Sequence, residues 1–151
     1  MRVYCAGPMS GKPQQNAPAF AAAAELLRSQ GHDVVTPVEL NAEIWWNHYG
    51  RDFDPASDVV GYGDPIANEF FARDLHEVCT RDAVGVLPGW QQSNGARLEV
   101  LLAELLRKVI LDATTGERIS TTIMQHMATY GAYQTGRDAA GNYVQPVTVL
   151  L

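Results

Sequence analysis

The chain of 151 residues has little cysteine, a minority of basic residues and no long apolar run. Its two cysteines, Cys5 and Cys79, have neither CxxC nor Cys/His metal-binding spacing, which indicates reduced thiols. Eleven Lys and Arg against seventeen Asp and Glu give a formal net charge of −6. This balance argues against a nucleic-acid polymer as partner, because tracking a phosphate backbone needs a basic surface. We expect a cytoplasmic protein with no membrane partner, since neither a signal peptide nor a membrane-spanning segment is recognisable.

The rest of the composition is that of an ordinary globular domain, with 46% hydrophobic and 19% charged residues. The length favours one domain over residues 1–151. The four histidines share no ligand spacing, so we predict no metal site, and nothing indicates a cofactor.

Short apolar runs alternate with amphipathic segments along the chain, which predicts a three-layer α/β fold with a mainly parallel sheet. Strands are expected at residues 2–6, 33–37, 83–88 and 108–113, and helices at 17–30, 66–80, 95–107 and 120–130. Residues 41–65, rich in Gly, Asp and Pro, predict a long loop with at most one helical turn. In such sheets ligands bind beyond the carboxyl ends of the strands, so the loops there are the place to look for chemistry.

One such loop, "LPGWQQSNGARLEV" at residues 87–100, leads into a helix that carries Glu99. We expect Asn94 to cap this helix and Glu99 to lie in its first turn, where the helix dipole favours the ionised carboxylate. Glu99 also borders the apolar stripe of the helix. Position alone leaves two interpretations open, a helix-capping carboxylate and a catalytic one.

Asp74 is a second unusual carboxylate, because helical spacing puts it on the apolar face with Phe70 and Val78. An aspartate there is costly unless it is paired or catalytic. Burial would raise its pKa while the helix start lowers that of Glu99, a separation that suits one proton donor and one nucleophile. The alternative is a structural ion pair, for example with Arg73.

The segments "VYCAGPMSG", "NAPAFAAAAELLRSQGHDVVTPVEL" and "RDLHEVCTRDAVGVLPGWQQSNGARLEVLLAELL" together resemble the nucleoside 2-deoxyribosyltransferase-like superfamily, in particular small phage and bacterial members related to nucleoside 5′-monophosphate N-glycosidases. The resemblance covers most of residues 2–112 and leaves 41–65 as an insertion and 113–151 as a C-terminal extension. It implies a Rossmann-like fold and cleavage of an N-glycosidic bond. By motif, Glu99 is the nucleophile and Asp74 the residue that handles the proton.

The resemblance also points to the substrate and to the assembly. Ser93 stands where the monophosphate hydrolases of the superfamily carry a phosphate-binding serine and the base-exchanging transferases an aspartate. Asn94 and Gly95 would add helix-start amides to this phosphate site, although the same residues also suit a plain polar cap. A homodimer or higher homo-oligomer is implied, with residues 113–130 as the segment that reaches across the interface.

The loop after the first strand would supply the other half of the phosphate site, through Gly7, Ser10 and Lys12, with no Walker motif. We expect Tyr4 and Met9 to line the sugar and base pocket, where a core role is the alternative for each. Trp90 would stack on the base or close the pocket, with packing as its alternative.

The sequence therefore predicts an enzyme that releases a free base from a (deoxy)nucleoside 5′-monophosphate, as a hydrolase or as a base-exchanging transferase. Two alternatives remain: a glycohydrolase acting on an NAD-type dinucleotide, and a non-catalytic nucleotide-binding or sensing module. Release of base separates the enzymes from the sensor, and preference for a monophosphate separates the two enzymes.

Overall fold

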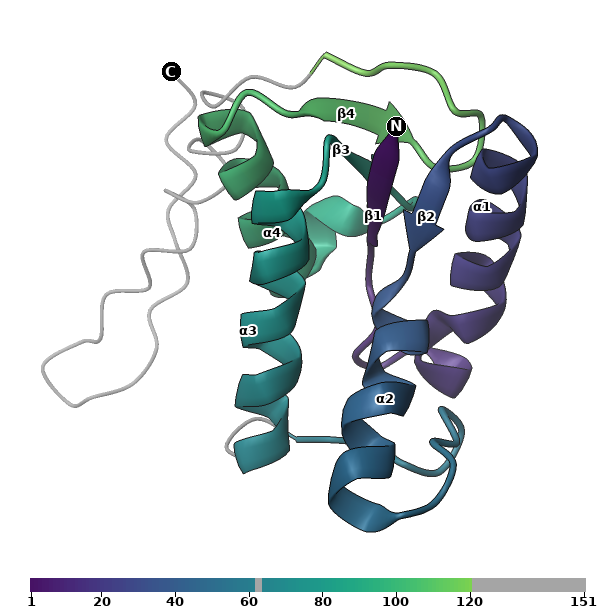
Figure 1. Ribbon diagram of the computed structural model, residues 1–151, viewed down its shortest axis with the longest axis vertical. Coiled ribbons are helices and arrows are strands. Elements are labelled where there is room, and N and C mark those ends of the chain that lie inside the picture. Colours follow the sequence, from purple (N-terminus) through teal and green to yellow (C-terminus); the bar gives the residue numbers. More distant parts are fainter. Residues whose placement is uncertain (62–63, 121–151) are drawn as a thin grey trace, which may run out of the picture. The chain divides into compact units, whose positions relative to one another are not determined.

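A four-stranded parallel sheet forms the centre of the computed structural model, which describes residues 1–61 and 64–120 (Figure 1). The strand order is β2-β1-β3-β4, with β1 at Arg2–Ala6, β2 at Asp33–Val35, β3 at Ala83–Val86 and β4 at Val109–Asp112. All three neighbouring pairs are parallel. The predicted α/β fold with a parallel sheet is confirmed.

The helices connect these strands and cover both faces of the sheet. They are α1 (Ala17–Ser29), α2 (Pro37–Tyr49), α3 (Pro65–Thr80) and α4 (Asn94–Leu105), with short 3-10 turns η1 (Pro13–Asn16) and η2 (Trp90–Gln92). Side chains of β1 alternate between the faces, as the pleat requires. Val3 and Cys5 join the core cluster built with α1, whereas Tyr4 and Ala6 join the cluster built with α3 and α4. The three layers are therefore α1, the sheet, and the α3–α4 pair (Figure 1).

The prediction of a long loop over residues 41–65 is wrong in its first part, because α2 continues to Tyr49. A capping box starts this helix: the Thr36 side chain accepts from the Glu39 amide at 3.2 Å, and Glu39 Oε2 accepts from the Thr36 amide at 3.0 Å. Few residues of α2 are buried, and they form one narrow stripe that consists of Pro37, Asn41 and Trp45. Trp45 packs against Ile66 of α3. That narrow stripe explains why the apolar periodicity of the segment is weak.

The part of the 41–65 segment that follows α2 is a loop. Its Asp58 is buried and accepts from both terminal nitrogens of Arg51, at 2.7 and 2.9 Å, and from the Asp54 amide at 2.8 Å. Gln15 of η1 donates to the carbonyl oxygens of Pro55 and Asp58. These contacts tie the loop to the turn that precedes α1.

Beyond β4 the chain turns and pairs Arg118 antiparallel with Leu111. The helix predicted over 120–130 and most of the C-terminal extension lie outside the described residues, and so does most of the segment predicted to reach a partner subunit. The single-domain prediction for 1–151 therefore stays a prediction. None of the helices within residues 1–61 and 64–120 has the length and apolar character to cross a membrane.

Candidate active site

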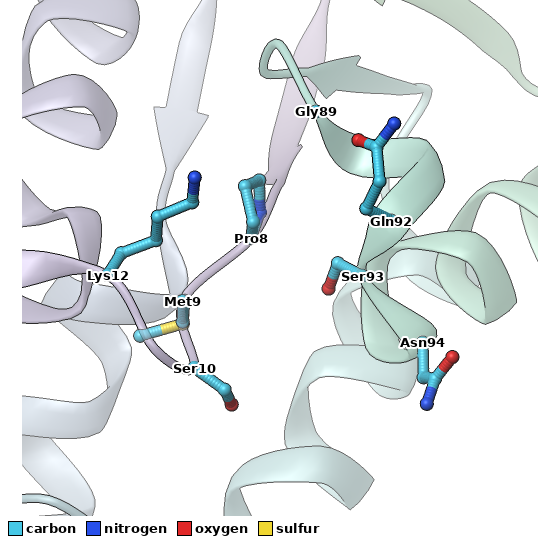
Figure 2. A pocket seen from close by; sticks show the side chains of 8 residues that line it. All are labelled: Pro8, Met9, Ser10, Lys12, Gly89, Gln92, Ser93 and Asn94. Atoms are coloured by element: carbon cyan, nitrogen blue, oxygen red, sulfur yellow. The ribbon is translucent and has the colours of Figure 1, made fainter.

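The loops after β1 and β3 meet at the carboxyl edge of the sheet because the two strands are parallel neighbours, with Ala6 opposite Val86. Between the loops lies a cavity of about 450 Å³. Figure 2 shows the first loop on one side and the residues that begin α4 on the other. The lining residues are Pro8, Met9, Ser10, Lys12, Gly89, Gln92, Ser93 and Asn94. The structure thus brings four of the predicted binding residues, Met9, Ser10, Ser93 and Asn94, to one cavity.

Two features of the cavity lining favour an anionic ligand: a positive charge and the start of α4. Lys12 is the only charged residue among the eight that line it. Ser93 is the cap of α4, and its hydroxyl accepts from the Ala96 amide at 3.3 Å. The prediction of Asn94 as cap is wrong by one residue, because Ser93 has the extended backbone that lets its side chain turn back to that amide. The amide end of α4 therefore points to the cavity wall.

A buried hydrogen bond joins Tyr4 to Glu99 of α4, the helix whose start borders the cavity. Tyr4 is fully buried on β1, and its hydroxyl donates to Glu99 Oε1 at 3.0 Å. Glu99 is only 5% exposed. Because α4 starts at Asn94, Glu99 lies in the second turn, and the helix has no acidic residue in its first turn. The prediction of a first-turn glutamate and the helix-cap interpretation are therefore both wrong.

Asp74 reaches the same place from α3 and is also buried. Its Oδ1 lies 2.5 Å from Nη2 of Arg73, and the same nitrogen lies 2.9 Å from Oδ1 of Asn41 on α2. The ion pair that the sequence left open thus exists, together with an electrostatic contact between Asp74 and Glu99.

The burial of this pair changes its acidity. Burial raises the pKa of Glu99 to about 8, and the charge of Asp74 contributes in the same direction, while Tyr4 and Arg73 act against it. Burial also raises the pKa of Asp74, against the opposing effect of Arg73. The prediction that the helix start lowers the pKa of Glu99 is wrong, because desolvation of an enclosed side chain outweighs the dipole beyond the first turn. At neutral pH the pair therefore holds a proton.

Four predicted binding residues do not line the cavity. One is Tyr4, which is buried against Glu99, and each of the other three also has a structural explanation. A Cβ at Gly7 would lie 2.8 Å from Cβ of Leu87, so Gly7 permits a close approach of the two loops. Trp90 is 7% exposed and packs in the core cluster that includes Tyr4. Gly95 lies in the first turn of α4. Substrate contacts of these residues stay predictions.

Sequence reasoning missed Asn41, Gln92, Pro8 and Gly89. Asn41 could be found only by recognising α2, where it lies one turn before Trp45 on the buried side. The "TPVE" capping signal was the available clue to that helix. Within the described part of the chain, no group of three or more His, Cys, Asp and Glu side chains could hold a metal ion.

Comparison with known proteins supports this architecture. The model of the family described as a domain of unknown function (DUF4406) matches residues 1–54 and 55–112. A solved structure of a 2-deoxyribosyltransferase from the psychrotolerant bacterium Bacillus psychrosaccharolyticus, described as a biocatalyst for the synthesis of antiviral and antitumoral nucleosides, is similar with a TM-score of 0.53 and 20% identity over 83% of this chain and 82% of that one. No curated protein matches. The similarity confirms the Rossmann-like fold that the resemblance to the deoxyribosyltransferase-like superfamily implied.

Proposed function

We propose that this chain, which belongs to the DUF4406 family, cleaves the N-glycosidic bond of a nucleoside 5′-monophosphate and passes the glycosyl group to water or to a second base. The observation that carries the proposal is the buried hydrogen bond between Tyr4 and Glu99, which lies next to Asp74. Glu99 belongs to α4, the helix whose start borders the cavity. The fold shared with a 2-deoxyribosyltransferase supports it.

The distance between Ser93 and Glu99 along α4 fits the separation between the phosphate and the anomeric carbon of such a substrate. Ser93 and Glu99 are six residues apart, which at 1.5 Å per residue is about 9 Å along the helix axis. A phosphate held at Ser93 and Lys12 would then leave the anomeric carbon of the same nucleotide near Glu99. Met9 and Ser10, which line the same cavity, would lie against the sugar and phosphate.

In the first step the Glu99 carboxylate forms a bond to C1′ while the bond from C1′ to the base nitrogen breaks. Glu99 must first lose the proton that its raised pKa retains. The Tyr4 hydroxyl hydrogen-bonds to Glu99 and also lowers the pKa of Asp74. Once its hydrogen turns from Glu99 to Asp74, its oxygen can accept the proton of Glu99 while it gives its own proton to Asp74. Asp74 then protonates the departing base, which leaves as a neutral molecule.

In the second step water attacks C1′ of the glycosyl-enzyme and Asp74 accepts its proton. The products are the sugar phosphate and free Glu99, and the proton count returns to its starting value. A second base in place of water gives a new nucleotide. The molecule that accepts the glycosyl group decides whether the enzyme is a hydrolase or a transferase, and the carboxyl pair would carry out the same steps in either case.

The test is release of free base, measured by chromatography, from nucleosides, ribo- and deoxynucleoside monophosphates and NAD. Each substrate is offered to the native protein and to Glu99→Gln, which keeps the side-chain shape and removes the nucleophile. Glu25→Gln is the matched control, because Glu25 is exposed on α1. We expect release from a monophosphate, lost by about a thousandfold or more in Glu99→Gln and unchanged in Glu25→Gln.

Other results would overturn parts of the proposal. Cleavage of NAD alone would identify a dinucleotide glycohydrolase. Binding of nucleotides without any release would identify a sensing module. Equal release by the native protein and Glu99→Gln would exclude Glu99 as the nucleophile.

A further inference from the structure

Arg73 occupies a fixed position between two helices next to the carboxyl pair. Its Nη2 contacts both Asp74 and Asn41, so α2 and α3 are joined through one nitrogen. The Arg73 side chain is 15% exposed and Asn41 is 3% exposed. The guanidinium also lies 5.7 Å from the centre of the Phe70 ring. A side chain held on three sides presents its charge to Asp74 in one orientation.

Among the described residues, few charged groups act on the carboxyl pair. The groups that act on Glu99 are Tyr4 from β1 and Asp74 and Arg73 from α3, and Glu77 of α3 acts on Asp74 as well. Among these groups Arg73 is the cation. One cation stabilises one of two neighbouring buried carboxylates, and the other then keeps its proton. Since Arg73 contacts Asp74, its charge favours ionisation of Asp74 over that of Glu99.

We propose that Arg73 is a positioning residue that keeps Asp74 ionised and leaves the proton of the pair on Glu99 before a substrate binds, and that Asn41 holds Arg73 in place for this. Its catalytic meaning rests on the proposed function: an ionised Asp74 is ready to receive the proton that Glu99 must give up. The placement of the proton itself needs no substrate and is measurable without one.

The experiment is a pH titration of the side-chain carboxyl carbons of Asp74 and Glu99 by 13C NMR, with signals assigned from Asp74→Asn and Glu99→Gln. Arg73→Met keeps the length of the side chain and removes its charge, and Arg73→Lys keeps the charge. Arg81→Met is the matched control, because Arg81 is also 15% exposed and also pairs with a carboxylate of α3, Glu77, at 2.6 Å. The pH dependence of base release is recorded on the same proteins.

In the native protein we expect Asp74 to titrate at lower pH than Glu99. In Arg73→Met the Asp74 midpoint should rise by about one pH unit or more, with substantial recovery in Arg73→Lys and no comparable change in Arg81→Met. Asn41→Leu, which keeps the volume and lacks the acceptor oxygen, should move the Asp74 midpoint in the same direction by a smaller amount. If Arg73→Met does not fold, Arg73→Lys and Asn41→Leu carry the test.

Unchanged midpoints in every folded variant of Arg73 and Asn41 would overturn the inference, and so would a native Asp74 that titrates above Glu99. The NMR result is independent of turnover. Base release with unchanged midpoints would leave the proposed function intact and remove the role of Arg73. Shifted midpoints without base release would do the opposite.

Discussion

The Tyr4 hydroxyl donates a hydrogen bond of 3.0 Å to Glu99 Oε1 across 95 residues of sequence. It joins the central strand β1 to α4, and both residues are buried. The hydroxyl is therefore placed to control the charge of the carboxyl that we propose as nucleophile. Four predictions follow from this bond, from the burial of Glu99, from the cavity beside α4 and from the contact of the two loops.

Removal of the Tyr4 hydroxyl should raise the pKa of Glu99, because the hydrogen bond from Tyr4 lowers it. We expect Tyr4→Phe to reduce kcat/KM for base release by about tenfold to a hundredfold, the worth of a hydrogen bond to a charged group. The alkaline limb of the pH–rate profile, where the pair loses the proton that the departing base needs, should move to higher pH. Tyr49→Phe, at an exposed tyrosine of α2, is the control and should change neither quantity. An unmoved alkaline limb in Tyr4→Phe would contradict the prediction.

The raised pKa of Glu99 should make the protein less stable as the pH rises. Below pH 4.5, the ordinary pKa of a glutamate, the carboxyl is protonated in both the folded and the unfolded protein, whereas between 4.5 and about 8 only the folded protein retains the proton. Unfolding then releases a proton, and the free energy of unfolding falls through this interval. Glu99→Gln removes the effect, so its Tm relative to the native protein should increase by several degrees from pH 5 to pH 8.

Thermal unfolding followed by circular dichroism at half-unit pH steps measures this difference. Glu25→Gln, on the exposed side of α1, should follow the native curve at every pH. A Tm difference between Glu99→Gln and the native protein that is constant from pH 5 to pH 8 would mean that Glu99 ionises normally in the folded state.

A negative charge at Ser93 should reject a phosphate without loss of the helix cap. Asp and Asn both cap helices as well as Ser does, so Ser93→Asp and Ser93→Asn keep the start of α4. We expect Ser93→Asp to raise KM for a monophosphate by about tenfold or more, through like-charge repulsion, with little change for the nucleoside. Ser93→Asn should change KM for the monophosphate and for the nucleoside by the same factor.

Loss of the cavity's cation is the complementary change. Lys12→Met should raise KM for the monophosphate more than KM for the nucleoside, as Ser93→Asp does, because Lys12 is the charged residue among those that line the cavity. Steady-state kinetics on matched nucleoside and monophosphate pairs provides the comparison. Equal losses for both substrates in Ser93→Asp and Lys12→Met would place the phosphate elsewhere.

The contact of the two loops can be tested by stability. Gly7→Ala puts a Cβ 2.8 Å from Cβ of Leu87, so something must shift, and we expect a loss of about 1–3 kcal/mol. Gly95→Ala is the matched glycine change, because nothing lies within 4 Å of its Cβ position and it is helical. It should be neutral or stabilising by up to about 1 kcal/mol.

Urea denaturation gives both free energies. Gly7→Ala combined with Leu87→Ala should lose less stability than the sum of the two single changes, because Leu87→Ala removes Cδ1 and Cγ, which would lie 2.9 and 3.2 Å from the new Cβ, and so relieves part of the crowding. Strict additivity would show that the two loops do not press on each other at this point.

Much of the fold was predictable because local pattern and burial agree in most segments. The strands of the parallel sheet are short apolar runs, and α1 and α3 have clear apolar stripes, so their order along the chain determines the α/β class. The segment of α2 resisted prediction because its buried side is narrow, with Asn41 and Trp45 in place of a row of aliphatic residues.

The sequence by itself determined which residues deserved interest: a glutamate on an apolar helix, an aspartate among phenylalanine and valine, and a serine at a helix start. Only the tertiary structure decided their state. It enclosed Glu99 beneath Tyr4, so that desolvation and the neighbouring carboxylate outweigh the helix dipole. It also brought Asn41 from α2 to Arg73 on α3, a contact between residues 32 positions apart that no local pattern contains. Acidity depends on everything that surrounds a group, and those surroundings come from distant parts of the chain.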